Sequence, residues 1–556
     1  MTTKSSSADP SFTKAAWTAG ICAFAASIAA VSPVAAQVAA AQEAEAVRLE
    51  ADVRFLADDL LEGREAGTRG YDLAAKFVAE RFRALGLEPA GGDGTYFQKV
   101  PMIQYGRVED FGGTLTFSGD DAPSLSLGAE YIVNASAKKE SGVVEAPVVF
   151  AGFGLVAPEH GRDDFSGLEV DGKIVMLLAG APKLLNSEER AHYGRTSIQR
   201  ASERGAVGVI RIWTETLENR YPYERLKKNA IGDTGMSWRT ADGTPFTNTP
   251  NIEASAVVSL VAAKKLFADQ PVKWAAISRA AEAKQGAVAG FDTGLVARIE
   301  YRSHQKEITT DNVIGMLPGT DPTLADEYVV VTGHLDHEGV KPTPEEADDE
   351  IYNGAMDNAT GIASILEVAR LLAMTPPKRP VLFVALTAEE KGLVGSDYLA
   401  QNPPMDDGAI VANINLDMPI ITYDFNDIVA FGAERSTMFP IVEAAAARAN
   451  LKLSPDPSPD EGFFTRSDQY SFVKQGIPAV YIDLGFGNGG EKAQGSFLKE
   501  HYHKVSDEVD LIDFAALGRF AQVNYEVVDG VANMHERPRW KAGDFFGAMF
   551  SGPMEE

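Results

Sequence analysis

Cysteine is nearly absent from this chain of 556 residues, because Cys22 is the only one. Cys22 lies in the N-terminal segment 1–36, which we predict to be removed as a signal peptide. The mature chain would then contain no cysteine, so neither a disulfide nor a thiol nucleophile can contribute. Histidine is also scarce, and two of the eight histidines stand close together in the stretch VVVTGHLDHEGV, residues 329–340.

Long hydrophobic runs are confined to the N-terminus. Two lysines precede an alanine-rich apolar run, Ala15–Val31, and small residues follow up to Ala36. This is the pattern of a signal peptide that is cleaved near Ala36. The alternative is an uncleaved membrane anchor, but the run is short for a span and is interrupted by Thr18 and Gly20. We expect a periplasmic or secreted protein with no stable membrane association after cleavage.

Basic charge is also in deficit, with 51 lysines and arginines against 79 acidic residues and a formal net charge of −28. Nucleic acids and anionic membrane surfaces bind to basic surfaces, so we expect neither as a partner. The fractions of hydrophobic (45%) and charged (23%) residues are those of an ordinary globular protein. The composition gives no indication of the oligomeric state.

The length favours more than one domain, because a single hydrophobic core stops growing at about 250–300 residues. From residue 131 to 290 the sequence consists of short β-rich runs such as Ile174–Leu178, separated by glycines and prolines. We predict a signal peptide in 1–36, the first part of the main domain in 37–130, an inserted β-rich domain in 131–290, the rest of the main domain in 291–535 and a C-terminal tail in 536–556.

The main domain alternates between strand and helix patterns. Short apolar runs at 328–332, 381–386, 410–414 and 478–482 are typical of strands that are buried on both faces of a mostly parallel sheet. Apolar residues at helical spacing predict helices that end near Gly86, that include Ile362 to Ala369 and that extend over 514–534. The sequence therefore predicts an α/β fold, with a mixed, mostly parallel sheet flanked by helices.

Histidines and carboxylates follow several of these strands or lie in nearby loops. They are His334, Asp336, Asp357, Glu389, Glu390, Asp417 and His503. In an open α/β sheet, ligands bind beyond the carboxyl ends of the strands, so these side chains are expected to lie together. Nitrogen and oxygen ligands suit zinc. The set exceeds what one zinc needs, so a pair of ions that share one carboxylate accounts for it better.

The order and context of these residues resemble the zinc aminopeptidases of the M28 type. The matching pieces are GHLD, GAMDNATG, LTAEEKGLVGS, INLDM and YHKVSDEVD. The N-terminal stretch DDLLEGREAGTRGYDLAAKFVAERFRALGLEPAG resembles the opening of bacterial secreted members. The β-rich stretch resembles the protease-associated domain that many of them carry as an insertion. The resemblance implies a fold of the zinc exopeptidase type and two Zn²⁺ ions per chain.

The resemblance also implies a role for each residue. His334 and Asp417 would bind one zinc, Glu390 and His503 the other, and Asp357 would bind both. Glu389 would be the general base that takes the proton of a metal-bridging water and passes it to the leaving amine. Asp336 would accept a hydrogen bond from the imidazole of His334 and fix its tautomer. The family further implies a cis peptide bond between Asp357 and Asn358.

Other residues near the motifs are assigned by their offset from the motif positions. We expect His337, Glu338 and His501 to be rim or surface groups. Arg466, Ser467 and Asp468 match a recurrent family segment that lines the substrate side, although ordinary loop packing explains this stretch equally well. Gln469 stands where many members have histidine, which leaves specificity open.

The expected function is the removal of N-terminal residues from peptides or small proteins by an exported dizinc exopeptidase. One alternative is a carboxypeptidase of the glutamate-carboxypeptidase type on the same scaffold, which needs a basic pocket for a substrate carboxylate. A second is a non-catalytic, receptor-like binding protein. A single-zinc glutaminyl cyclase and a phosphate-type hydrolase also remain open, because metals do not name their substrate.

Overall fold

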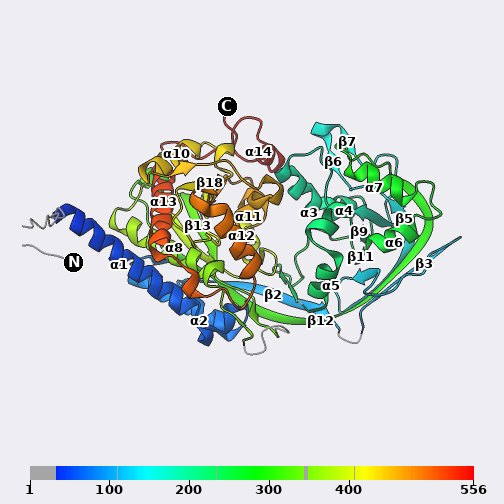
Figure 1. Ribbon diagram of the computed structural model, residues 1–556, viewed down its shortest axis with the longest axis horizontal. Coiled ribbons are helices and arrows are strands. Elements are labelled where there is room, and N and C mark those ends of the chain that lie inside the picture. Colours follow the sequence, from blue (N-terminus) through cyan, green and yellow to red (C-terminus); the bar gives the residue numbers. More distant parts are fainter. Residues whose placement is uncertain (1–32, 109–110, 233, 343–348, 406) are drawn as a thin grey trace, which may run out of the picture.

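The computed structural model describes residues 33–108, 111–232, 234–342, 349–405 and 407–556. The chain forms two lobes that are joined by the long strand β12 (Phe291–Leu317) (Figure 1). Most of the predicted signal peptide, residues 1–32, lies outside the described residues. Helix α1 (Pro33–Leu56) begins before the expected cleavage position at Ala36. Within the described ranges, every helix is too short or too polar to cross a membrane.

The main lobe is built on a mixed sheet whose four central strands are parallel. In spatial order they are β20 (Ala479–Leu484), β17 (Ala409–Asn415), β13 (Glu327–His334) and β16 (Val381–Leu386). Antiparallel β18 (Asp427–Phe431) and the short β19 (Lys452–Leu453) lie on one side. The second half of β12 and then β2 (Phe97–Arg107) continue the sheet on the other side. The predicted α/β sheet is confirmed.

Both faces of this sheet are covered by helices. Val329 and Val331 of β13 pack into one hydrophobic core and Val330 into another, because successive side chains of a strand point to opposite faces. The first core includes side chains from α1, α2 (Arg69–Ala84), α8 (Thr360–Met374), α10 (Phe439–Arg448) and α13 (Phe514–Ala532). The second includes α9 (Val394–Gln401) and α11 (Gln469–Val473). Burial on both faces explains the continuous apolar runs of the central strands.

The helix predicted before Gly86 is α2, and its end has the expected chemistry. Gly86 has a φ of +79°, a left-handed conformation that glycine adopts without steric cost. Its N–H donates to the carbonyl of Arg83, and the N–H of Leu87 donates to that of Phe82. These bonds satisfy carbonyls that the last turn would otherwise leave free, so the chain turns sharply into the next segment.

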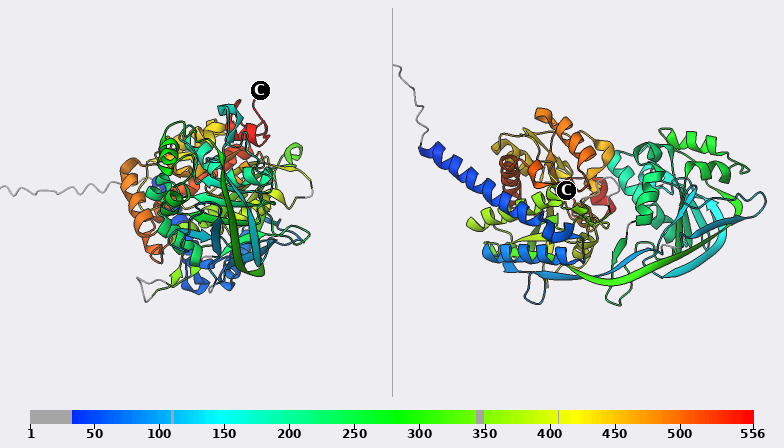
Figure 2. Two further views of the ribbon diagram at one scale, coloured as in Figure 1. Left: turned by 90° about the vertical axis from the view of Figure 1, so that its right-hand side faces the viewer. Right: turned by 60° about the horizontal axis from the view of Figure 1, so that its bottom comes forward.

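The second lobe has its own sheet, which shares β12 with the main lobe (Figure 2). From β12, the order is β5 (Ser141–Phe150), β8 (Ile174–Leu178), β9 (Gly208–Ile212), β11 (Ala254–Val258) and β4 (Tyr131–Val133). The four strands from β5 to β11 are parallel. Strand β3 (Thr114–Ser118) pairs with β12 in this lobe, so the sheet extends beyond the predicted bounds 131–290.

Helices make up a larger part of the second lobe than the β-rich prediction allowed. They are α3 (Ser187–Glu203), α4 (Glu215–Arg220), α5 (Tyr223–Gly232), α6 (Leu260–Leu266) and α7 (Trp274–Glu282). The lobe is therefore an α/β unit. Its likeness to a protease-associated domain stays a prediction.

Shorter elements complete the chain. They are β1 (Glu88–Pro89), β6 (Val156–Ala157), β7 (Arg162–Asp163), β10 (Gly235–Trp238), β14 (Gly339–Val340), β15 (Ile351–Tyr352), α12 (Gly490–Glu500) and α14 (Phe545–Met549).

The segment 536–556, predicted only as a tail, folds back onto both lobes. Trp540 is fully buried, and its indole N–H donates to the carbonyl of Gly476 over 2.8 Å. Phe546 of α14 is also fully buried, while Phe545 packs against His192 and Tyr193 of the second lobe. The C-terminal segment therefore contributes to the hydrophobic core and connects the lobes (Figure 1).

Replacing Trp540 by alanine is expected to lower the free energy of unfolding by about 3–5 kcal/mol, because a large buried side chain and its hydrogen bond are lost. Urea-induced unfolding followed by circular dichroism measures this change. Arg537→Ala, at an exposed position of the same segment, is the control and should unfold like the wild type. Equal unfolding midpoints for the two variants would contradict the packing of this segment.

Candidate metal centre

The predicted site residues gather at the edge of the main sheet where the parallel strands end. His334 is the last residue of β13, and Glu389 and Glu390 follow β16 after two residues. Asp417 follows β17 after one residue. Neighbouring parallel strands have their carboxyl ends at one edge, so these side chains converge there.

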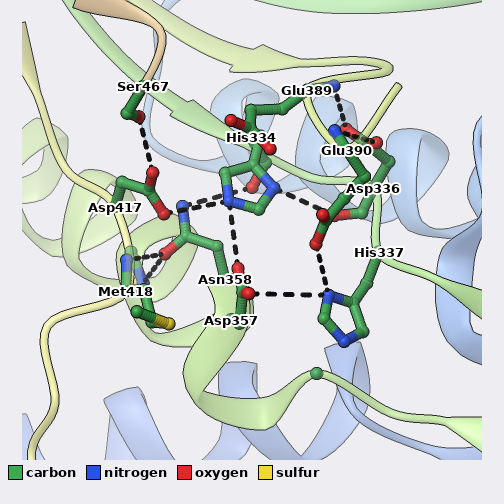
Figure 3. Close-up of polar contacts among 12 residues, drawn as sticks. His334, Asp336, His337, Asp357, Asn358, Glu389, Glu390, Asp417, Met418 and Ser467 are labelled. Atoms are coloured by element: carbon green, nitrogen blue, oxygen red, sulfur yellow. Dashed lines mark hydrogen bonds and ion pairs between the residues drawn. The ribbon is translucent and has the colours of Figure 1, made fainter. Parts of the chain in front are cut away.

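Asp357 lies between two imidazoles. Its Oδ1 is 3.2 Å from Nε2 of His334, and its Oδ2 is 3.2 Å from Nε2 of His503. Each imidazole also faces a second carboxylate. Nε2 of His334 lies 3.0 Å from Oδ1 of Asp417 (Figure 3), and Nε2 of His503 lies 3.3 Å from Oε2 of Glu390. The structure thus forms two donor groups that share Asp357.

The spacing of these donor atoms fits zinc. Four ligands at about 2.0–2.1 Å around a tetrahedral zinc are about 3.3 Å from one another. The nitrogen-to-oxygen distances in both groups, 3.0–3.3 Å, match that separation. The donors are imidazole nitrogens and carboxylate oxygens, the types that zinc binds in peptidases. The residues present therefore fit two zinc ions with a common carboxylate.

The backbone around Asp357 is held from two sides. Asp507 accepts hydrogen bonds from the N–H groups of Met356 (2.9 Å) and Asp357 (3.0 Å). The side chain of Asn358 accepts from the N–H of Met418 at 2.9 Å and donates to the carbonyl of Leu416 at 3.0 Å. The peptide bond between Asp357 and Asn358 is cis, as the resemblance implied. These contacts tie the start of α8 to the end of β17.

Asp336 has a different role from the one expected. Nδ1 of His334 is 3.0 Å from the main-chain carbonyl of Asp336, not from its carboxylate. The carboxylate instead accepts from the backbone N–H groups of Glu389 (3.0 Å) and Glu390 (3.3 Å) (Figure 3). The carbonyl oxygen can accept a hydrogen bond only when Nδ1 carries the hydrogen, which leaves the unprotonated Nε2 of His334 free to bind an ion. The carboxylate positions the two glutamates.

The prediction that His337 and Glu338 are rim groups is wrong. His337 is fully buried, and its Nδ1 lies 2.9 Å from Oε1 of Glu390. Oε1 of Glu338 is 3.2 Å from Nδ1 of His503. Glu338 therefore orients His503 as Asp336 was expected to orient His334. The error arises because the chain after β13 turns back under the site, and sequence offset alone does not show that turn.

His501, by contrast, stays outside the donor groups. Its Nδ1 lies 3.0 Å from the carbonyl and from the hydroxyl of Ser506. It therefore supports the local loop.

Arg64 was not predicted as a site residue, but it holds the backbone segments that precede Asp336 and Asp357. Its fully buried guanidinium donates to the carbonyls of Leu335 (3.0 Å), Asn353 (2.6 Å) and Gly354 (3.0 Å). Burial lowers the pKa of Arg64 to about 10, although the nearby Asp507 opposes that shift. No local pattern marks Arg64, because these acceptors lie 271 to 290 residues further along the chain.

Three residues in or next to the donor groups adopt left-handed backbone conformations that are rare for non-glycine residues. Ala388 has a φ of 53°, Met418 of 39° and His503 of 53°. Such conformations cost about 1–3 kcal/mol each and persist where the surrounding structure enforces them. The contacts of the site therefore hold these loops in backbone conformations that they would not favour on their own.

The acidic groups determine the electrostatics of the site. Burial opposes the charged form of His334, but Asp417 and Asp357 outweigh it and raise its pKa well above the usual value. Burial raises the pKa of Glu389 well above its usual value, and the nearby Glu390 adds to that shift while His334 opposes it. A site with so many carboxylates favours bound cations, and zinc ions held by these residues would offset the negative charge.

A cavity of about 80 Å³ opens over the donor groups. Besides the predicted residues, Met418, Phe463, Tyr481 and Tyr502 line it. Phe463 and Tyr481 belong to the stretch 460–482 that was expected to line the substrate side, whereas Met418 and Tyr502, from two other loops, were not predicted. These four side chains give the cavity an apolar side next to its charged donor groups.

The three predicted substrate-binding residues differ in their environments. Arg466 and Ser467 line the cavity, but Arg466 pairs with Glu461 at 2.8 Å, and Ser467 donates to Asp417 at 2.5 Å. Asp468 is fully buried, and burial raises its pKa to about 7. Gln469 is buried too, and it accepts from Asn415 at 3.0 Å. Asp468 and Gln469 do not line the cavity, so their contacts are with neighbouring protein groups.

These features define a candidate two-metal site at the carboxyl edge of an α/β sheet. Residues 312–528 match the family model of Peptidase family M28, and all seven predicted motif residues lie in this range. This part of the chain therefore matches the M28 peptidases, and the resemblance seen in the sequence is confirmed over these residues.

Several known peptidases are similar to parts of this chain. A probable zinc metalloprotease of Pyrenophora teres f. teres is 38% identical over 111 residues, which are 20% of this chain and 22% of that protein. Aminopeptidase Y of Saccharomyces cerevisiae is 28% identical over 227 residues, 38% of this chain and 37% of that protein. The chain thus spans less than half the length of either relative.

Among solved structures, the aminopeptidase from Aneurinibacillus sp. strain AM-1 aligns with 87% of this chain and 93% of its own. The sequence identity is 18% and the TM-score is 0.48.

Proposed function

We propose that this chain is an exported exopeptidase that removes N-terminal residues from peptides, with two zinc ions per chain and Glu389 as general base. The observation that carries the proposal is the pair of donor groups that share Asp357, His334 with Asp417 and His503 with Glu390. The match to the M28 peptidases over residues 312–528 supports it.

Peptide hydrolysis at this site would use the bound zinc, Glu389 and Asp336 in different roles. Bound zinc supplies Lewis acidity, which polarises the peptide carbonyl and lowers the pKa of water towards ~7. Glu389 lines the cavity beside His334, so its carboxylate can take a proton from the attacking water and deliver it to the leaving amine. Asp336 holds the backbone of Glu389 through its N–H, which fixes where that carboxylate lies.

The aminopeptidase reaction is favoured over the carboxypeptidase alternative by the charges around the metal cavity. Among the described residues, Arg466 is the only lysine or arginine that lines this cavity. Its guanidinium already pairs with Glu461 and lies over the ring of Phe463 at 5.4 Å. A substrate carboxylate next to the metals would have to compete with Glu461 for the guanidinium of Arg466. A protonated free amine would instead face the carboxylates of the donor groups.

A panel of aminoacyl-nitroanilides and peptides with free or acetylated N-termini tests the proposal. We expect about two zinc ions per chain by metal analysis, cleavage only of substrates with a free amine, and loss of activity with a chelator. Acetylated peptides that are cleaved as fast as free ones would refute the aminopeptidase assignment. A protein that binds no zinc would favour a non-catalytic binding protein.

The proposal of export rests on the N-terminal sequence. Residues 1–36 carry the charge and apolar pattern of a signal peptide, so we propose that the mature protein is periplasmic or secreted. N-terminal sequencing of the protein recovered outside the cytoplasm should begin near Gln37. A mature protein that retains Met1 would contradict this proposal.

A further inference from the structure

A second, larger cavity lies between the two lobes, next to the metal cavity. Its volume is about 470 Å³, and most of its lining comes from the second lobe. Asp460 and Glu461 of the main lobe also line it. The next residues of that segment, Phe463, Arg466 and Ser467, line the metal cavity. The short segment 460–467 is therefore a wall that the two cavities share.

The second cavity is cationic, although the whole chain carries a formal charge of −28. Five cationic side chains and three carboxylates line it. Three of the cations pair with those carboxylates: Lys183 with Glu282, Arg190 with Asp460 and Arg220 with Glu461. Two positive charges, those of Arg195 and Arg211, remain. Among the described residues, no carboxylate forms an ion pair with either of them.

Arg195 and Arg211 are suited to an anion. Arg195 extends from α3 of the second lobe, and one of its guanidinium nitrogens donates to the carbonyl of Thr465 at 2.6 Å. That bond places it beside the wall between the cavities. Arg211 lies on β9, and its Nε has no hydrogen-bond partner within the described part of the chain. Burial removes water from both guanidinium groups and lowers their pKa values. A bound anion would replace the lost hydration and stabilise each positive charge.

We infer that the second cavity binds a carboxylate of the peptide substrate, through Arg195 and Arg211. A peptide whose reacting end lies at the metals would pass the wall at Phe463 and Arg466 and continue into this cavity. Guanidinium groups bind carboxylates through two parallel hydrogen bonds, which gives selectivity for acidic over neutral groups. The carboxylate belongs either to an acidic side chain or to the C-terminus of a short peptide. This inference rests on the proposed peptidase function.

A scan of one glutamate along a peptide tests the inference. The peptides have a free N-terminus and an amidated C-terminus, with Glu or Gln at each position from the second to the sixth, and a parallel set keeps the C-terminal acid. For the wild type we expect kcat/KM to be about tenfold higher for Glu than for Gln at one position, or for the acid than for the amide at one length. The first result identifies a side-chain carboxylate, and the second identifies the C-terminus.

Substitutions then assign the preference to the two arginines. Arg195→Gln and Arg211→Gln should each reduce the Glu-to-Gln ratio towards one. Arg298→Gln removes an arginine from the same lobe that lies outside the cavity and pairs with Glu300, so it should keep the wild-type ratio. Equal kcat/KM for all Glu and Gln peptides, and for acids and amides, would overturn the inference.

Binding to the zinc-loaded Glu389→Gln variant separates the inference from the proposed function, since this measurement does not require turnover. Tighter binding of the Glu or acid peptides that is lost with Arg211→Gln supports the inference even if the wild type cleaves none of them. In that case only the peptidase proposal fails. Equal binding of charged and neutral peptides, together with normal cleavage, overturns the inference and leaves the peptidase proposal intact.

Discussion

Replacing Glu389 by glutamine is expected to reduce kcat by about 10²–10⁴-fold while zinc content stays near two ions per chain. Glutamine has nearly the same shape as glutamate but cannot accept a proton at neutral pH. Its backbone N–H would still donate to Asp336 over 3.0 Å, so the loop should keep its position. The loss therefore falls on proton transfer, and KM should change little.

Two measurements check this expectation. Steady-state kinetics on an aminoacyl-nitroanilide give kcat, and metal analysis of the same sample gives zinc content. Glu434→Gln, at an exposed position away from the cavity, is the matched control and should behave like the wild type. If the Glu389 variant lost zinc in proportion to activity, Glu389 would be a ligand and not the base.

Replacing Asp357 by alanine is expected to remove both zinc ions and to reduce activity to background. Its two carboxylate oxygens face different imidazoles, each at 3.2 Å, so one substitution opens both donor groups. It also leaves Asp417 and Glu390 as partly buried charges without a common partner, which weakens any residual site.

Single-histidine variants provide the comparison that makes this prediction specific. His334→Ala should lose the ion held with Asp417, and His503→Ala the ion held with Glu390, so each should retain about one zinc per chain. Zinc content is measured by atomic absorption after gel filtration in metal-free buffer. If Asp357→Ala retained as much zinc as either histidine variant, Asp357 would not be shared.

Several parts of the fold followed from local patterns alone. The predicted strand 381–386 coincides with β16, and residues 174–178 coincide with β8. Both are continuous apolar runs that are buried throughout, a pattern that few other local structures produce. Helix α2 was recognised because its apolar stripe ends at a glycine that adopts the left-handed conformation.

Helix α3 escaped prediction because its buried face is unusually polar. The buried residues of this helix are His192, Tyr193, Ser197, Ala201 and Ser202. Such a face shows no apolar stripe at helical spacing, which is the signal that sequence analysis uses. His192 is buried, and its Nδ1 lies 2.6 Å from the hydroxyl of Tyr470, in a segment 278 residues away. The second lobe therefore looked richer in strands than it is.

The sequence by itself determined the main sheet, the order of the motifs and the candidate ligands, because strand burial and short motifs are local properties. Only the tertiary structure decided the roles of the charged neighbours. The carboxylate of Asp336 supports Glu389 and Glu390, Glu338 orients His503, and His337 contacts Glu390. These roles depend on the direction of each side chain in a folded loop and on partners 53 to 165 residues away, which no local pattern encodes.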